Sequence, residues 1–389
     1  MIKVLARQIK QYKLPSILTV LFTIGESIAE TTIPFIAAFI IDEGISKGSM
    51  NNILFYGAIM LATAGLSLFF GIMAGRMAAV AATGYSKNLR HAMFTNIQTY
   101  AFSNIDKYST AGLVTRLTTD VTNIQNSYQM LMRITLRSPI NLIYALIMSF
   151  FISAKMSMIY LVGLVFLVIV FSFIIKNSMK YFTQVFKKYD DLNMSVQENV
   201  SSIRVVKAFV REDHEKNKFN KATENLYKLF IKAEKITTLN MPALNLTVYG
   251  SIIAIAWFGA NLIYSGEMST GNITTLFAYA MTILMSLMML SMVFVMLSMS
   301  VASGKRIVEV IEEKSDITNG ENPIFKVENG EVVFENVDFA YNKNSKKPTL
   351  ENINIKINEG EIIGVIGNTG SGKTSLVNLI SRLYDVTKG

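Results

Sequence analysis

Six long apolar stretches constrain the fold of this chain more than any other feature. Each is long enough to cross a hydrocarbon core of about 30 Å. The composition agrees, because 51% of the residues are hydrophobic and only 17% are charged, whereas about a quarter are charged in soluble domains. The sequence therefore predicts an α-helical membrane protein. Its six transmembrane helices are predicted at Leu14–Ile41, Ile53–Gly75, Ile134–Ala154, Met156–Ile175, Leu244–Ser265 and Ile273–Met299.

The distribution of basic residues predicts the topology. Almost all of the 37 Lys and Arg residues lie in the N-terminal segment, the two long connections or the C-terminal part, and Lys47 and Lys155 are the exceptions. Positive residues concentrate on the cytoplasmic side of membrane proteins. We therefore expect a multi-pass protein of the cell membrane, the plasma or inner membrane, in contact with membrane lipids. Both termini and both long connections would be cytoplasmic. No patch of basic and aromatic residues indicates nucleic-acid binding.

The rare residue types exclude several kinds of site. The chain has no Cys, which excludes disulfides, thiolate metal sites and a Cys nucleophile. Its two histidines, His91 and His214, lie far apart in polar stretches and are predicted to be solvated helix residues. The N-terminus lacks the short apolar core and cleavage site of a signal peptide.

The composition changes after Ser303, where a soluble domain is predicted. We expect a transmembrane domain over 1–310, a polar linker over 311–324 and the N-terminal part of an α/β domain over 325–389. Val333, Val337 and Phe339 are predicted on one strand, and Ile353, Ile355 and Ile357 alternate with polar residues on another. A sheet covered on both faces needs more chain than this, so we expect this α/β domain to be incomplete.

Residues 367–374 read Gly-Asn-Thr-Gly-Ser-Gly-Lys-Thr. They fit G-x-x-x-x-G-K-[ST], a loop whose backbone N–H groups cradle the phosphates of ATP or GTP. The preceding Glu361–Ile366 is predicted to be a buried strand, and Thr374–Leu383 a helix. That strand–loop–helix context favours a P-loop nucleotide site over a chance match.

The whole chain resembles a half-transporter of the ABC exporter family, of the bacterial multidrug type. Six spans, two long cytoplasmic connections and then a P-loop domain follow each other in the order of that family. Residues 105–121 and 197–212 resemble its two intracellular coupling segments, and Val337–Tyr341 resembles its aromatic strand.

The resemblance implies a site for ATP with Mg²⁺. Lys373 would contact the β- and γ-phosphate oxygens, Thr374 would be the metal ligand, and Tyr341 would stack on adenine, unless it only covers the sheet edge. The predicted cofactor-binding residues are Tyr341, Gly367, Asn368, Thr369, Gly370, Ser371, Gly372, Lys373, Thr374 and Ser375. No catalytic residue is assigned, because the family's glutamine loop, signature loop, catalytic carboxylate and switch histidine do not occur in these 389 residues. We therefore expect a C-terminally truncated half that does not hydrolyse ATP alone.

The coupling segments are predicted to carry short docking helices. Arg116 and Asp120 lie four residues apart and could pair along one of them. Phe209 would be the apolar anchor of the other, with Arg204, Lys207 and Glu212 around it. The alternative is that both are ordinary amphipathic helices.

Inside the predicted membrane domain, three features stand out. The last span carries a methionine stripe, which would line a substrate cavity or pack against a neighbouring helix. Glu26 and Glu30 lie one turn apart, and such buried charges face a cavity or pair with a basic residue; pairing is favoured. Gly71 and Gly75 form a small-x-x-x-small packing pattern. The stripe comprises Met281, Met285, Met288, Met292, Met296 and Met299.

The resemblance implies ATP-driven export of amphipathic or lipophilic compounds by a dimer of two halves, identical or different. One alternative is a nucleotide-binding but non-hydrolysing membrane partner subunit. Another is export of lipids or peptides. An importer permease is disfavoured, because importers generally keep the two domains on separate chains.

Overall fold

The computed structural model describes residues 1–319, 323, 326, 329–342, 345 and 347–389, with the side chains of 291–292 and 294–299 also left undescribed. The chain divides into two compact units. The membrane unit comprises Thr19–Gly75 and Arg133–Val293. The clasp unit comprises Met1–Leu18, Arg76–Met132 and Phe294–Gly389.

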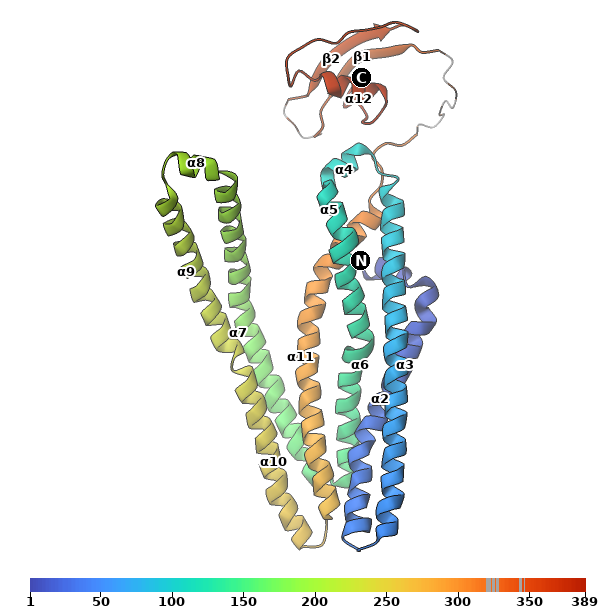
Figure 1. Cartoon of the computed structure of the whole chain (residues 1–389), viewed down its shortest axis with the longest axis vertical. Helices are drawn as coiled ribbons and strands as arrows, with labels where there is room; N and C mark the ends of the chain where they lie inside the picture. The colour runs from blue at the N-terminus through green and yellow to red at the C-terminus, as the bar shows by residue number, and fades with distance from the viewer. Residues whose placement is uncertain (320–322, 324–325, 327–328, 343–344, 346) are drawn as a thin grey trace. The chain divides into compact units, whose positions relative to one another are not determined.

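The described chain is mostly helical, with one small sheet (Figure 1). The membrane-length helices are interrupted by short helical turns at the N-terminus and in the connections. The elements are α1 Ile2–Arg7, η1 Lys10–Tyr12, α2 Lys13–Phe39, η2 Ile40–Ile45, α3 Met50–Ile97, α4 Phe102–Tyr108, α5 Thr110–Thr115, η3 Arg116–Asp120, α6 Val121–Ile152, α7 Ala154–Ser201, α8 Ile203–Ala208, α9 Glu212–Thr237, α10 Asn240–Tyr264, α11 Thr270–Glu312, β1 Val332–Phe339, β2 Leu350–Ile357 and α12 Lys373–Ile380.

The six predicted spans are confirmed as helical segments long and apolar enough to cross a membrane. Each predicted stretch overlaps one of these segments. Several segments run far beyond the apolar stretch, as expected for helices that continue past a bilayer. Among the described residues they are Lys10–Ile45, Met50–Ile97, Thr110–Ile152, Ala154–Ser201, Glu212–Tyr264 and Thr270–Leu290.

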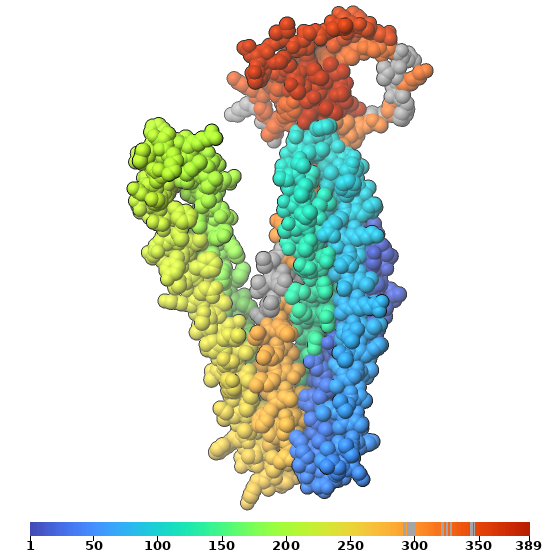
Figure 2. Space-filling view, in the orientation of Figure 1, coloured from blue at the N-terminus to red at the C-terminus, as the bar shows by residue number. Residues whose placement is uncertain are grey.

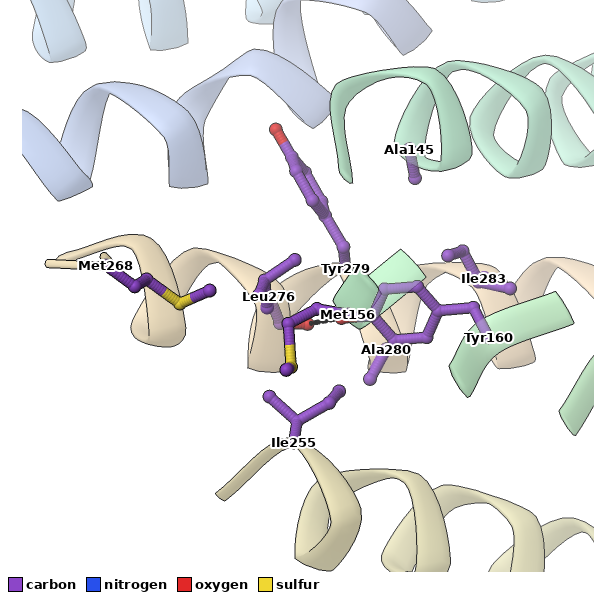
Figure 3. Close-up of a cluster of buried hydrophobic side chains, with 9 residues drawn as sticks. All are labelled: Ala145, Met156, Tyr160, Ile255, Met268, Leu276, Tyr279, Ala280 and Ile283. Carbon is purple, nitrogen blue, oxygen red and sulfur yellow. Dashed lines mark hydrogen bonds between the residues drawn. The ribbon is translucent and has the colours of Figure 1, made fainter. Parts of the chain in front are cut away.

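In the membrane unit, α7 packs along both α9 and α10 (Figure 1). A buried cluster from α6, α7, α10 and α11 forms its largest apolar core (Figure 3). The start of α11 is fixed by Asp42, which accepts hydrogen bonds from Ser269 Oγ at 2.6 Å and the Gly271 N–H at 2.9 Å. A carboxylate there is favourable, because the first N–H groups of a helix have no partner within it.

The predicted pairing of Glu26 and Glu30 is confirmed, and the basic partners come from α6. Arg137 bonds Glu26 at 3.0 Å and also contacts Glu30, and Arg133 lies 3.6 Å from the second Glu26 oxygen. Arg137 lies inside the third predicted span, so it is a further exception to the distribution of basic residues. An intramembrane charge is stabilised by such opposite partners.

The two glycines of the small-x-x-x-small pattern lie beside these charges. A Cβ at Gly71 would sit 3.1 Å from the Glu26 carboxylate, and one at Gly75 would sit 3.5 Å from an Arg133 nitrogen. Glycine at position 71 therefore makes room for the Glu26 carboxylate between α2 and α3.

The clasp unit has its own apolar core, built from α3, α6 and the end of α11. Its fully buried side chains include Leu89, Met93, Val121 and Ile307, and Leu5 of α1 packs against them. The core therefore joins three segments that are far apart in the chain.

The soluble part of this unit is a two-stranded antiparallel hairpin of β1 and β2 with α12 packed on it (Figure 1). Phe339, Leu350 and Leu379 are buried at their contact. The predicted strand members lie on β1 and β2, but Val333 is exposed while Val337 and Phe339 are buried. The register shifts between Phe334 and Val337, and such a bulge moves the following side chains to the other face.

The predicted buried strand at Glu361–Ile366 is wrong. These residues form no strand, and Ile362 and Ile366 are almost fully exposed, at 98% and 97%. A strand needs a hydrogen-bonded neighbour and a covered face, and the described chain supplies neither to this segment. An apolar run of β character is therefore not sufficient to form a strand here.

Candidate functional site

The glycine-rich loop joins the exposed 361–366 segment to α12. Gly370 and Gly372 have φ of +85° and +88°, a region that side-chain-bearing residues rarely adopt. A Cβ at Gly367 would lie 2.7 Å from Ser371 Oγ, and one at Gly372 would lie 2.6 Å from a Leu350 methyl. The loop conformation therefore requires glycine at these three positions of the motif.

Lys373 is the first residue of α12, and its side chain folds back over the loop. Its ammonium donates to the carbonyl oxygens of Gly367 at 2.8 Å and Asn368 at 2.9 Å. The positive charge is thus held at the loop, next to the N-terminus of an eight-residue helix. Both features favour an anionic ligand there.

The two hydroxyl residues after Lys373 differ in orientation. Thr374 is exposed, whereas Ser375 is buried and its hydroxyl lies 3.0 Å from that of Tyr341. Thr374 is therefore the accessible hydroxyl, and Ser375 ties α12 to the segment after β1. The Tyr341 ring also makes edge contacts with Phe339 and Tyr384, at centroid distances of 4.8 and 5.1 Å.

These residues fit a nucleotide triphosphate with a divalent cation. The glycines leave the loop backbone uncovered by side chains, Lys373 supplies a point charge, and Thr374 offers a hydroxyl oxygen of the kind Mg²⁺ accepts. When bound, Mg²⁺ would neutralise phosphate charge beside Lys373.

The first predicted coupling segment forms α4, α5 and η3, and its charged residues are held by α11. Arg116 does not pair with Asp120, so that prediction is wrong. Arg116 bonds Glu309 at 3.0 Å and stacks on the Tyr108 ring at 4.6 Å. Asp120 accepts from Arg306 Nε at 2.7 Å and Ser303 Oγ at 2.9 Å. Cross-helix partners are available because α11 lies alongside this segment.

A second set of contacts, which the sequence analysis missed, surrounds Glu313 at the end of α11. Its carboxylate accepts from Lys107 at 2.8 Å, Tyr108 at 2.6 Å and Asn104 at 3.1 Å. Burial alone would raise the pKa of Glu313, but these three hydrogen bonds outweigh it and hold the pKa below its usual value. We call these residues the Glu313 clasp.

Two further side chains, Asn96 and Tyr100, donate hydrogen bonds to the last carbonyl groups of α11. Asn96 donates to the carbonyl oxygens of Val310 at 2.7 Å and Glu313 at 2.8 Å. Tyr100 donates to Val310 at 2.8 Å, and burial raises the pKa of Tyr100 to about 12, so it stays a donor. These side chains cap a helix end whose carbonyls would otherwise have no partner. No short sequence pattern indicates them, because each donor lies at least 210 residues from its acceptor in the chain.

The first coupling segment also contacts the soluble part of the same unit. The Tyr384 hydroxyl donates to Asp106 at 2.8 Å, and its ring lies 6.2 Å from that of Phe102. Burial and this hydrogen bond raise the pKa of Tyr384 to about 12. One tyrosine thus joins α4 to the segment following α12.

The second predicted coupling segment ends in α8, which connects the tips of α7 and α9. The α8 region is the green tip in Figures 1 and 2. Next to α8 in the chain, Phe209 is 74% exposed and Val210 is 81% exposed. Val210 has φ of +52°, which is strained for a β-branched residue. Lys207 bonds Glu212 at 2.9 Å, as their predicted proximity suggested, and both line a cavity of about 350 Å³ beneath α8.

The methionine stripe is exposed where it is described. Met281, Met285 and Met288 have 37–55% of their surface accessible, so the chain covers each of them only in part. Met292, Met296 and Met299 lie outside the described side chains. The described part of the stripe is therefore free to face another molecule.

Comparison with known proteins covers both parts of the chain. Residues 16–302 match the family described as ABC transporter transmembrane region, and residues 350–389 match the family described as ABC transporter. The first match covers five of the six predicted spans in full and all but the first two residues of Leu14–Ile41.

Several curated proteins are similar along the whole chain. An uncharacterized ABC transporter ATP-binding protein of Mycobacterium tuberculosis is 30% identical over all of this chain and 67% of its own length. The uncharacterized ABC transporter ATP-binding protein YfiB of Bacillus subtilis is 30% identical over 98% of this chain and 66% of its own. The chain thus spans about two thirds of these relatives. The mouse ABC-type oligopeptide transporter ABCB9 is 24% identical over 95% of this chain and 48% of its own length.

Proposed function

Because this chain belongs to the ABC transporter family, we propose that it is the membrane half and the start of the nucleotide domain of an ATP-driven exporter. The observation that carries the proposal is the loop over 367–374, where three required glycines and the folded-back Lys373 surround one helix N-terminus. An anionic phosphate chain is the ligand that this arrangement favours.

In this proposal each loop residue has a distinct role. Amides over 367–373 bind phosphate oxygens, Lys373 neutralises their charge, and Thr374 holds Mg²⁺. Ser375 positions Tyr341 through their hydroxyl contact, and the Tyr341 ring offers a face to adenine. The remaining residues of the cofactor site supply backbone only.

The test is photolabelling of the full chain in lipid nanodiscs with azido-ATP and Mg²⁺. We expect labelling that excess ATP prevents and that Lys373→Ala abolishes. Lys356→Ala is the matched control, because Lys356 is an exposed lysine of the same unit that pairs with Glu331 at 3.0 Å. Equal labelling of both variants would contradict the assignment.

We further propose that the protein acts as a dimer of two halves. The Tyr384–Asp106 contact supports a connection between the first coupling segment and the soluble part of the same chain. Phe209 and Val210, which directly follow α8, are largely exposed within the described chain. A nucleotide domain of a second half would cover them. Crosslinking between Cys variants at Phe209 and at exposed Val377 of α12 in a partner copy tests this, and the absence of natural Cys keeps the background low.

The proposed cargo is amphipathic or lipophilic. Exposed methionines on α11 suit shape-variable apolar ligands. Glu26 and Glu30 are already paired with arginines. They are therefore not free carboxylates that would attract a cationic cargo. Peptides are a second proposed cargo class, because the mouse relative is named as an oligopeptide transporter. ATP-stimulated export of a fluorescent lipophilic dye from proteoliposomes, without export of a labelled peptide mixture, would favour the amphipathic or lipophilic cargo.

The second candidate function is a nucleotide-binding partner subunit that does not hydrolyse. It would use the same phosphate loop and the same Lys373 as the exporter. Binding of labelled ATP without phosphate release, both alone and mixed with a complete half, would support it. Phosphate release that requires Lys373 would support the exporter.

A further inference from the structure

Several buried polar atoms of the membrane unit have no hydrogen-bond partner. Among described side chains, buried nitrogen and oxygen atoms without a hydrogen-bond partner come mainly from α2, α6 and α11, and we call this group the polar seam. More than 90% of buried polar groups in proteins are paired, and an unpaired one in hydrocarbon costs several kcal/mol. The seam comprises Thr23, Ser27, Thr31 and Glu26 Oε2 from α2, Thr135 and Asn141 from α6, and Tyr279 from α11. Glu26 Oε2 makes no hydrogen bond but lies 3.6 Å from an Arg133 nitrogen.

On α2 the seam follows one helical face. Thr23, Ser27 and Thr31 are spaced four residues apart, a spacing that places side chains on one face, and each is at most 3% exposed. The adjacent Thr32 behaves differently, because its hydroxyl bonds the Ile28 carbonyl at 2.7 Å and the Tyr144 hydroxyl at 3.1 Å. Thr23, Ser27 and Thr31 thus differ from Thr32, whose hydroxyl is bonded on the same helix.

On α11, Tyr279 points into this region. Its side chain is fully buried and its hydroxyl has no partner. Figure 3 shows its ring directed away from the other labelled side chains, with the hydroxyl toward the ribbons of α2 and α6. One turn earlier, Thr275 bonds the Pro34 carbonyl at 2.9 Å, which places this part of α11 against α2.

A second tyrosine of the same cluster provides a contrast. Tyr160 is 2% exposed, and its hydroxyl donates to the Leu276 carbonyl at 2.5 Å. The two tyrosines share one core and the same degree of burial. They differ in whether the protein supplies a partner for the hydroxyl.

We propose that the polar seam is a binding site for a small group of water molecules between α2, α6 and α11. Its hydroxyls can donate and accept, while the Asn141 and Glu26 oxygens accept, so together they offer water the two to four bonds it needs. Arg133 and Arg137 already neutralise Glu26, and their positive charge opposes a bound metal cation. Water is therefore the ligand that matches both the burial and the chemistry.

The test is radiolytic hydroxyl-radical labelling of the full chain in nanodiscs prepared with ¹⁸O-water. Radicals form from water at the site, so a buried side chain next to bound water is oxidised while a dry one is spared. We expect several-fold more ¹⁸O at Tyr279 than at Tyr160. Equal labelling of these two tyrosines would overturn the proposal.

A pair of variants separates bound water from general opening of the bundle. Ser27→Ala combined with Thr31→Val removes two water partners and is expected to lower Tyr279 labelling several-fold. Thr63→Val is the control, since Thr63 on α3 is not part of the seam and bonds its own helix at the Ile59 carbonyl. Tyr279 labelling that is unchanged in the double variant would contradict a site built from the α2 face. This outcome is independent of nucleotide binding and export.

Discussion

The two long connections between membrane helices resemble each other in sequence character but differ in the contacts that hold them. The first, over α4, α5 and η3, is bound to its own chain through the Glu313 clasp and the Asp120–Arg306 pair. The second, around α8, has mainly local contacts and exposes Phe209 and Val210. Both connections contain amphipathic helices. The first finds its contacts within the chain, whereas the second leaves apolar side chains exposed.

Among the proposed variants, Asp120→Asn should lower the stability of the folded chain the most. The Asp120 carboxylate is 1% exposed and bonds Arg306 and Ser303. Removing one partner of a buried pair costs about 3–5 kcal/mol, and because Arg306 is nearly half exposed to water we expect about 2 kcal/mol. A lowered thermal midpoint in detergent is the readout. Asp213→Asn, in an exposed pair with Lys216, should leave the midpoint unchanged, and equal shifts would contradict the contrast.

Glu313→Gln should have the next largest effect. It removes the charge that receives hydrogen bonds from Lys107 and Tyr108, which is worth about 1–2 kcal/mol. We expect faster proteolysis at the end of α11 and in α4, with α8 unaffected. Glu224→Gln, in an exposed pair with Lys228 on α9, is the control. Unaltered cleavage near α11 would show that the clasp does not hold this end.

The pH dependence of the clasp follows from the lowered pKa of Glu313. Its stabilising contribution is present above the ordinary value of 4.5 and is lost as pH falls through the lower folded value. The unfolding midpoint of the native chain should therefore fall more between pH 5 and pH 3 than that of Glu313→Gln. Parallel curves for the two proteins would refute this role.

Phe209→Asp should have the smallest effect on stability. The ring is exposed in the described chain, so we expect a change within about 0.5 kcal/mol. Under the proposed dimeric function, the same change should remove crosslinking to a second copy. A large loss of stability would mean that the α8 tip is packed within its own chain, and the comparison would fail.

Much of the fold could be predicted because its signals are local. Span length follows from the hydrocarbon thickness, and the glycines of 367–374 follow from backbone angles that other residues avoid. The strand predicted at Glu361–Ile366 failed because strand formation depends on a neighbour, which a local apolar run does not guarantee. The predicted Arg116–Asp120 pair was wrong because spacing identifies only residues that can meet. In the structure, Arg116 and Asp120 pair instead with Glu309 and Arg306 of α11.

By itself, the sequence determined which segments are helical in a membrane and where a phosphate-binding loop can form. Only the tertiary structure decided which charges pair: Glu26 with arginines of α6, Asp120 with Arg306, and Glu313 with residues of α4. The physical reason is that hydrophobic length and backbone conformation act over a few turns of chain. Hydrogen bonds and ion pairs act over about 3 Å in space, between residues that folding brings together from distant positions.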